Sequence, residues 1–206
     1  MTSLKLRTIG HMAEIDAIKW DNLVAASGGS VMLKHAFLQA FETSTSVSLD
    51  TGWQPQHLLF LDENELVGAI PLYAKSHSYG EFVFDWAWAE AYQKSGMDYY
   101  PKLISAIPFS PVTSERLLVS SNQKSSQIQS LMVEALEEIM HNNHFSSAHV
   151  LFPNDNSAEI LTQSKWLQRN GVQFQWHNEN FKDFDAFLLQ LTQEKRKKIR
   201  QERKKV

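Results

Sequence analysis

The sequence contains no cysteine. This absence excludes disulfide bonds, thiolate metal ligands and a cysteine nucleophile, although it does not fix the cellular compartment. Long apolar runs are also absent: no stretch approaches the roughly 18 apolar residues of a membrane-spanning helix, and the start of the chain has no apolar leader segment. We therefore expect a soluble, cytoplasmic protein without a membrane span.

Common catalytic and metal-binding motifs are missing as well. The sequence has no H-E-x-x-H motif, no G-x-S-x-G elbow and no Walker phosphate loop. His141 and His144 stand near a predicted helix end without an acidic partner close in sequence, so we predict no metal site. The 206 residues suffice for one large domain or two small ones, with a core that needs no disulfide or metal.

The net charge of -3 conceals a basic C-terminal segment. Between Glu194 and Lys205 there are eight Lys or Arg and two Glu, a local charge of +6, which leaves -9 for the rest of the chain. Clustered Lys and Arg attract phosphate, so residues 194–205 are a candidate RNA contact. A solvated linker helix with pairs such as Glu194–Lys198 explains the same pattern.

Hydrophobic periodicity and turn residues predict helices and strands in mixed order. The helices are expected at residues 12–25, 35–44, 87–94, 125–141, 154–169 and 181–206. The strands are expected in a hairpin at 57–75 and at 81–86, 102–107, 115–120, 148–152 and 172–177. This order predicts an α/β or α+β domain in which a mixed sheet is flanked by helices.

The run Pro71–Leu118 mixes Trp, Tyr and Phe at close spacing with charged residues. A core segment separates apolar from charged residues by period, and an ordinary loop is poorer in aromatic rings. Rings that enclose a ligand, with a few polar groups to orient it, are typical of a concave binding site. A core sheet with Tyr and Trp at its rim is the alternative interpretation.

Glu81 and Asp85 are the candidate catalytic residues, with Asp85 preferred. Residues four apart on a strand have their side chains on one face. Among aromatic rings that face is partly desolvated, which raises a carboxyl pKa and suits a general base for an attacking amine. A structural salt bridge to Lys102 or Arg116 is the alternative explanation of the two carboxylates.

Candidate binding residues surround these carboxylates in the sequence. Lys75 is suited to hold a phosphate or carboxylate, and Lys102 and Arg116 are suited to pair with a diphosphate or carboxylate. His77 is able to shuttle a proton near neutral pH, unless it is a structural histidine bonded to a carbonyl. The predicted substrate-binding set is Lys75, His77, Ser78, Trp86, Trp88, Tyr99, Tyr100, Lys102 and Arg116.

Several long motifs give the chain a family resemblance. They cover most of residues 33–120 and the C-terminal segment, and they read FLQAFETSTSV, GWQPQHL, IPLYAKSHSYGEFVFDWAWAEAY, DYYPKLISAIPFSPVTSERLL and EKRKKIRQERKKV. With these motifs the chain resembles the FemAB-like proteins of peptidoglycan biosynthesis and recognition. Those are relatives of the Fem aminoacyltransferases in the GNAT (acyl-CoA N-acyltransferase) fold superfamily. Ser114 departs from the pattern, which usually has Gly there.

The resemblance implies a GNAT-like fold with a mixed, mostly antiparallel central sheet, flanking helices and a C-terminal basic helix. Family members run to nearly twice this length, with two GNAT-like halves joined by the basic segment. The implied domains are an N-terminal lobe at residues 1–180 and a helical arm at 181–206 that leads towards a second lobe. We also expect a dimer through the surface that the second lobe would cover.

The implied activity is the transfer of an acyl or aminoacyl group onto an amine, with cell-wall precursors as the substrates of Fem enzymes. Acyl-CoA and aminoacyl-tRNA are the implied donors of the full-length protein. The nearest match to the GNAT pyrophosphate loop, residues 168–171, ends a predicted helix instead of starting one. We therefore expect an acceptor-binding lobe without a cofactor of its own, inactive alone. A non-catalytic module that recognises peptidoglycan fragments or RNA is the alternative.

Overall fold

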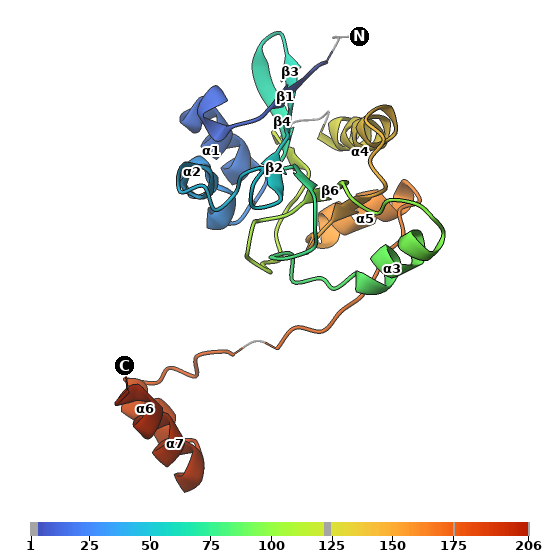
Figure 1. The fold of residues 1–206 in the computed structure, drawn as a ribbon. Coiled ribbons are helices and arrows are strands. Elements are labelled where there is room, and N and C mark those ends of the chain that lie inside the picture. Colours follow the sequence, from blue (N-terminus) through green and yellow to red (C-terminus); the bar gives the residue numbers. More distant parts are fainter. Residues whose placement is uncertain (1–3, 122–124, 175, 206) are drawn as a thin grey trace. The chain divides into compact units, whose positions relative to one another are not determined.

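The computed structural model describes residues 4–121, 125–174 and 176–205 (Figure 1). The chain divides into two compact units, with the boundary between Gln168 and Arg169. The first unit holds both sheets and five of the labelled helices, and the second holds two short helices.

The strands of the first unit form two four-stranded sheets within the described residues. The first sheet has the order β1-β3-β4-β7, all antiparallel, and consists of Lys5–Ile9, His57–Asp62, Glu65–Ile70 and Leu118–Val119. The second has the order β2-β5-β6-β8 and consists of Trp53–Pro55, Tyr73–Lys75, Lys102–Ser105 and Ala148–Val150. Among the described strands of the second sheet, β6 and β8 pair in parallel and the other neighbours are antiparallel. The predicted α+β class with mostly antiparallel pairing is confirmed.

The two sheets meet where the predicted hairpin crosses from one to the other. Pro71 and Leu72 separate β4 from β5, and Gln56 separates β2 from β3. Proline has no N–H for the ladder, so the regular pairing stops there. One bond survives at the junction, because the Gln56 N–H donates to the Leu72 carbonyl over 2.8 Å.

Helices cover both faces of the first sheet (Figure 1). On one side lie α1 (Ala17–Ala26) and α2 (His35–Thr43), which enclose a core that includes Trp20, Leu59 and Leu118. On the other side α4 (Ser125–Asn142) and α5 (Asp155–Gln163) cover a second core around Leu58. The even periodicity of α4 explains why its prediction was close: Ile128, Met132, Ala135 and Leu136 are all buried.

Several predicted elements are wrong. Residues 81–86 are not a strand: Phe82 has a φ of 59°, which breaks an extended run, and α3 starts at Trp86 and ends at Lys94. The described residues of 172–177 form no strand, and they belong to neither sheet. The expected helix 154–169 ends at Gln163. Strands β1 and β2 were not predicted.

The second unit replaces the single predicted helix 181–206 with two. Helix α6 spans Phe184–Leu189, and α7 spans Gln193–Arg203 after an N-cap at Thr192. Thr192 accepts from a first-turn N–H and so starts a new helix instead of continuing the old one. Among the described residues, no helix combines the length and apolar character that a membrane crossing requires.

Candidate functional site

A row of three large side chains crosses the second sheet. Trp53 on β2 is the direct partner of Lys75 on β5, and Lys75 is the direct partner of Lys102 on β6. Directly opposed residues in antiparallel strands have their side chains on the same face. All three are 1% exposed or less, so two lysines are buried next to each other on one face of a sheet. Like charges in opposed positions are unfavourable, so this arrangement needs compensating anions.

Those anions come from the loop of residues 76–85 that follows β5. The Lys102 Nζ donates to Glu81 Oε2 at 2.9 Å, to Ser78 Oγ at 2.9 Å and to Asp85 Oδ2. Both carboxylates are buried, with Glu81 3% and Asp85 4% exposed. The predicted salt bridge to Lys102 is therefore present, and it gathers both candidate carboxylates on one ammonium.

Two tyrosines from the segment before β6 complete what we call the Lys102 cluster: Lys102, Ser78, Glu81, Asp85, Tyr99 and Tyr100. The Tyr99 hydroxyl donates to Asp85 Oδ2 at 2.7 Å, and the Tyr100 hydroxyl lies 2.8 Å from Ser78 Oγ. Both rings also face the ammonium, with their centroids 5.3 Å and 5.8 Å from Lys102 Nζ. These cation–π contacts lower the free energy of a charge held away from water.

The cluster nevertheless leaves two acceptors open. Within the described residues, Glu81 Oε1 and Asp85 Oδ1 are buried and have no hydrogen-bond partner. The indole Nε1 of Trp53, in the adjacent row, also has none there. Most buried polar atoms in proteins are paired, and an unpaired one costs about 1–3 kcal/mol.

Lys75 is the less satisfied of the two lysines. Its ammonium donates to the Tyr79 carbonyl at 3.3 Å and lies 3.9 Å from the centroid of the Trp53 ring. Burial lowers its pKa to about 8; the nearby Lys102 adds to this effect, and Glu81 partly offsets it. A lysine in such surroundings readily changes its charge near physiological pH.

The two carboxyl groups have opposite pKa shifts. Burial raises the pKa of Glu81, and the attraction of Lys102 only partly offsets this. Burial also acts to raise the pKa of Asp85, but hydrogen bonds from Lys102 and Tyr99 outweigh it and lower the pKa below its ordinary value. Glu81 is thus the more basic of the two carboxylates, and Asp85 is the more acidic one that holds Lys102.

His149 on β8 is a neighbour of the cluster that the sequence did not single out. Its Nε2 lies 3.3 Å from the Tyr99 hydroxyl and 2.8 Å from Ser147 Oγ. Burial and the nearby Lys102 lower the pKa of His149 to about 4, so the ring is neutral at physiological pH. No signal in the sequence places it here, because β6 and β8 are far apart in the chain and meet only through their parallel pairing.

Three predicted binding residues lie at the surface around the loop. His77 Nδ1 accepts from the Tyr79 N–H at 3.2 Å, and burial lowers its pKa. Trp86 packs edge-on against Tyr79 at 5.4 Å between centroids and is 46% exposed. Trp88 is 56% exposed. These rings are available to a ligand, while the charged groups lie beneath the surface.

Arg116 is not part of this cluster. It is fully buried, and its guanidinium donates to the carbonyls of Leu151 (2.9 Å), Val112 (2.7 Å) and Glu115 (3.3 Å). Burial lowers its pKa to about 10, and Glu115 opposes this. Its three carbonyl partners are main-chain atoms, so Arg116 is engaged with the protein backbone and lies apart from the Lys102 cluster.

Glu115 beside it is equally well satisfied. Its Oε1 accepts from the N–H groups of Arg116 and Leu117 at 3.1 Å and from the Ser157 hydroxyl, and its Oε2 accepts from the side-chain amides of Asn154 at 3.3 Å and Asn156 at 2.9 Å. We call Glu115, Arg116, Asn154, Asn156 and Ser157 the Glu115 cluster. It joins the segment before β7 to the start of α5.

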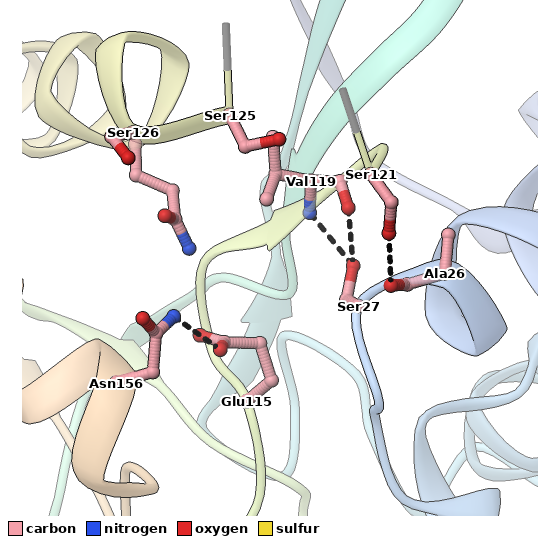
Figure 2. Close-up of a pocket in the computed structure, with 9 residues that line it drawn as sticks. Ala26, Ser27, Glu115, Val119, Ser121, Ser125, Ser126 and Asn156 are labelled. Carbon is pink, nitrogen blue, oxygen red and sulfur yellow. Dashed lines mark hydrogen bonds between the residues drawn. The ribbon is translucent and has the colours of Figure 1, made fainter. Parts of the chain in front are cut away.

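A pocket of about 640 Å³ lies next to the Glu115 cluster, between α1, β7 and the start of α4 (Figure 2). The residues that line it are Ala26, Ser27, Glu115, Val119, Ser121, Ser125, Ser126, Gln129 and Asn156. Its polar groups are largely engaged: Ser27 bonds Val119, Ser121 donates to Ala26, and Asn156 donates to Glu115 (Figure 2). None of the predicted site residues lines it, so the pocket and the Lys102 cluster are separate features.

No group of His, Asp and Glu among the described residues has an arrangement suited to a metal ion. The Lys102 cluster itself offers two carboxylates of different basicity, one lysine and hydroxyl donors, and Lys75 lies beside it on the sheet. Such a set is able to bind an amine, remove a proton from it and keep the charge balanced.

The sequence matches the model of the FemAB-like family, described as peptidoglycan biosynthesis/recognition, over residues 11–206. No curated protein matches it significantly. The match includes both the Lys102 cluster and the basic C-terminal segment.

Solved structures of N-acetyltransferases resemble the chain at low identity. The ribosomal-protein-alanine N-acetyltransferase from Brucella melitensis biovar Abortus 2308 aligns with a TM-score of 0.49 at 12% identity, covering 85% of this chain and 100% of the other. The aminoglycoside 6'-N-acetyltransferase from Acinetobacter baumannii has a TM-score of 0.46 at 10% identity, covering 85% and 99%. Similarity at this level says nothing about activity.

Proposed function

Because the chain belongs to the FemAB-like family of peptidoglycan biosynthesis/recognition, we propose that it is the acceptor-binding lobe of an N-acyl- or aminoacyltransferase that acts on cell-wall precursors. One observation carries the proposal: the Lys102 cluster holds two buried carboxylate oxygens, Glu81 Oε1 and Asp85 Oδ1, that have no partner in the described structure. Open, buried carboxylate oxygens are suited to the ammonium group of an amine acceptor.

Glu81 is the general base of the proposed reaction. An acceptor enters as an ammonium, loses one proton, and its nitrogen then attacks the acyl carbonyl of the donor. The carbonyl carbon's bond to the donor's sulfur (acyl-CoA) or ribose oxygen (aminoacyl-tRNA) then breaks, the nitrogen gives up its second proton to form the amide, and the released thiol or hydroxyl takes up a proton. Glu81 takes the first proton because burial raises its pKa towards neutrality. Asp85, the residue preferred from sequence, has a lowered pKa and instead keeps Lys102 charged and in place.

The surface rings serve to hold the rest of the acceptor. Tyr79, Trp86 and Trp88 are 67%, 46% and 56% exposed and follow one another around the loop and the first turn of α3. Exposed aromatic faces bind sugar rings and peptide groups by van der Waals contact. They would place a precursor over the loop with its amine towards Glu81.

The donor belongs to a second lobe, as the family resemblance implies, and is an acyl-CoA or an aminoacyl-tRNA. The chain alone is then a binding protein that does not turn over. A dimer through the surface left for the second lobe is part of the same proposal, and the protein carries out this work in the cytoplasm.

Binding tests the proposal directly. We would measure thermal stabilisation of the chain by cell-wall precursor fragments with a free amine and by the same fragments after N-acetylation. The free amines should raise the melting temperature, and both acetylation of the ligand and the substitution Glu81→Gln should abolish the rise. Equal stabilisation by acetylated and free fragments, or none by either, would refute an amine-acceptor role.

A second candidate function, recognition of RNA, is supported by the way α7 sorts its basic residues. Its arginines bond within the second unit: Arg196 donates to the Leu189 carbonyl at 3.3 Å, Arg200 pairs with Asp185 at 3.3 Å, and Arg203 lies over the Phe184 ring at 4.3 Å. The lysines at 195, 197 and 198 are exposed.

Helix α7 therefore has an inner side, whose arginines contact residues of α6, and an outer side, which carries the exposed lysines. The outer side matches a phosphate backbone in charge, and the helix has no outward apolar stripe that would favour insertion into lipid. We would measure RNA binding against salt concentration for the wild-type chain and for a Lys195→Gln, Lys197→Gln, Lys198→Gln variant. A shallower salt dependence in the variant is expected; an unchanged slope would exclude RNA binding by this face.

A further inference from the structure

Most of the unpaired buried polar atoms in the described part of the chain lie at one place. Within the described residues they are Trp53 Nε1, Asp62 Oδ1, Glu81 Oε1, Asp85 Oδ1 and Ser105 Oγ. Three of the five belong to the sheet row or to the Lys102 cluster that lies on it. Each unpaired buried polar atom raises the free energy of the folded state. A missing ligand therefore explains a group of them better than chance does.

This place has both hydrogen-bond acceptors and hydrogen-bond donors that are not used by the described residues. Glu81 Oε1 and Asp85 Oδ1 are unused acceptors. Trp53 Nε1 is an unused donor, and Lys75 has three N–H bonds for the single carbonyl it is seen to contact, that of Tyr79. A ligand that satisfies all of them must itself carry donors at one end and acceptors at the other.

The order of residues along the sheet separates the two kinds. The row runs Trp53, Lys75, Lys102, so the unused donors lie at one end and the carboxylates bound to Lys102 lie at the other. The loop of residues 76–85 lies against this row: a Cβ built on Gly80 would come within 3.4 Å of the Trp53 ring. Loop and row thus enclose donors and acceptors at neighbouring positions.

The charge balance of the site limits which kinds of ligand it can bind. Two lysines and two carboxylates sum to zero when all are ionised, and all four are buried. A simple amine or a simple carboxylate would add an uncompensated charge to a site away from water, which is strongly unfavourable. A group that carries one positive and one negative charge leaves the balance at zero.

We propose that the site binds the α-amino-acid head group, an ammonium and a carboxylate on one carbon, of a free amino acid or of a peptide side chain that ends in this group. The ammonium bonds to Glu81 Oε1 and Asp85 Oδ1, and the carboxylate bonds to Lys75 Nζ and Trp53 Nε1. This rests on the proposed function and names the chemistry of its acceptor. The head group enters when the loop of residues 76–85 moves away from the row.

A matched set of three probes tests the head group. We would titrate the chain with 2-aminohexanoate, with 1-aminopentane and with hexanoate, which share one alkyl tail and differ only in the charged end. The zwitterion should bind at least tenfold more tightly than either singly charged probe. In Lys75→Met this preference over the amine should disappear, while Glu81→Gln should weaken binding of the zwitterion itself.

Control variants separate a site from a structural effect. Glu115→Gln, in the Glu115 cluster, should leave binding of the zwitterion unchanged, and circular dichroism checks that each variant is folded. If 1-aminopentane binds as tightly as 2-aminohexanoate, the zwitterion proposal is wrong and the amine-acceptor function still stands. If none of the three binds, or Lys75→Met keeps the full preference, the proposal is also wrong, and the acetylated and free precursor fragments still decide the proposed function separately.

Discussion

The Lys102 cluster and the Glu115 cluster are both buried groups of charge, yet they differ in how completely they are satisfied. Each oxygen of Glu115 accepts at least two hydrogen bonds, and Arg116 donates to three carbonyls. In the Lys102 cluster Glu81 and Asp85 each keep one oxygen without a partner in the described structure. A fully paired network is suited to fixing loops, while a partly paired one keeps capacity for a ligand.

The largest loss of stability is expected in the Glu115 cluster, whose hydrogen bonds are the more completely paired. Arg116→Met should lower the free energy of unfolding by about 3–5 kcal/mol, because three buried carbonyls lose their donor and the Glu115 carboxylate loses a nearby positive charge. Urea unfolding measures the loss. A drop below about 1 kcal/mol would show that the hydrogen bonds of Arg116 do not hold the segment before β7 to the chain at Leu151.

Removal of the ammonium group of Lys102 from the Lys102 cluster should cause a somewhat smaller loss of stability. Lys102→Met leaves Glu81 and Asp85 without their ammonium, and we expect a loss of about 3 kcal/mol at neutral pH. Glu81 limits the loss by taking up a proton, since its pKa is already raised. Adding Glu81→Gln and Asp85→Asn to Lys102→Met should recover most of the stability, as measured by urea unfolding; no recovery would argue against charge as the cause.

A matched pair of isosteric changes compares the clusters most closely. In Glu115→Gln the new NH2 group must face other donors, since both oxygens of Glu115 accept bonds, so we expect a loss of about 1–3 kcal/mol. In Glu81→Gln the NH2 group can take the place of the unpaired Oε1, so the loss should stay within about 1 kcal/mol. Equal losses of stability in urea unfolding would show that the Lys102 cluster and the Glu115 cluster do not differ in how completely they are paired.

The smallest effect concerns Lys75 and depends on pH. Its folded pKa of about 8 lies below the ordinary value of 10.5, so the unfolded chain binds more protons between those values. Lys75 therefore makes the wild type more stable as pH rises through this window, relative to a variant without the group. Lys75→Met should be about 1 kcal/mol more stable than the wild type at pH 7, and this advantage should shrink by pH 10. A constant difference across the window would contradict the lowered pKa.

The sequence was informative where periodicity is regular. Helix α4 and the hairpin strands β3 and β4 were predicted close to their observed bounds, because their apolar residues repeat with the period of the element. Residues 81–86, EFVFDW, are predicted to form a strand and do not form one. The left-handed φ of Phe82, which interrupts an extended run, cannot be read from the sequence pattern.

The structure brings three of the predicted site residues together. The loop of residues 76–85 places Glu81 and Asp85 against Lys102, instead of on the shared strand face that the sequence predicts. Arg116 was grouped with them because it is nearby in sequence, yet its donors end in a different network. His149 was missed, since only the parallel pairing of β6 and β8 carries it to Tyr99.

The central claim is that the open oxygens of the Lys102 cluster are where an amine acceptor binds. A high-resolution crystal structure of the chain with an amine-bearing cell-wall precursor fragment tests this claim most directly. We predict the nitrogen of the fragment within hydrogen-bond distance of Glu81 Oε1 and Asp85 Oδ1. Ordered water molecules on both oxygens, with the fragment absent or bound in the pocket beside Glu115, would contradict it.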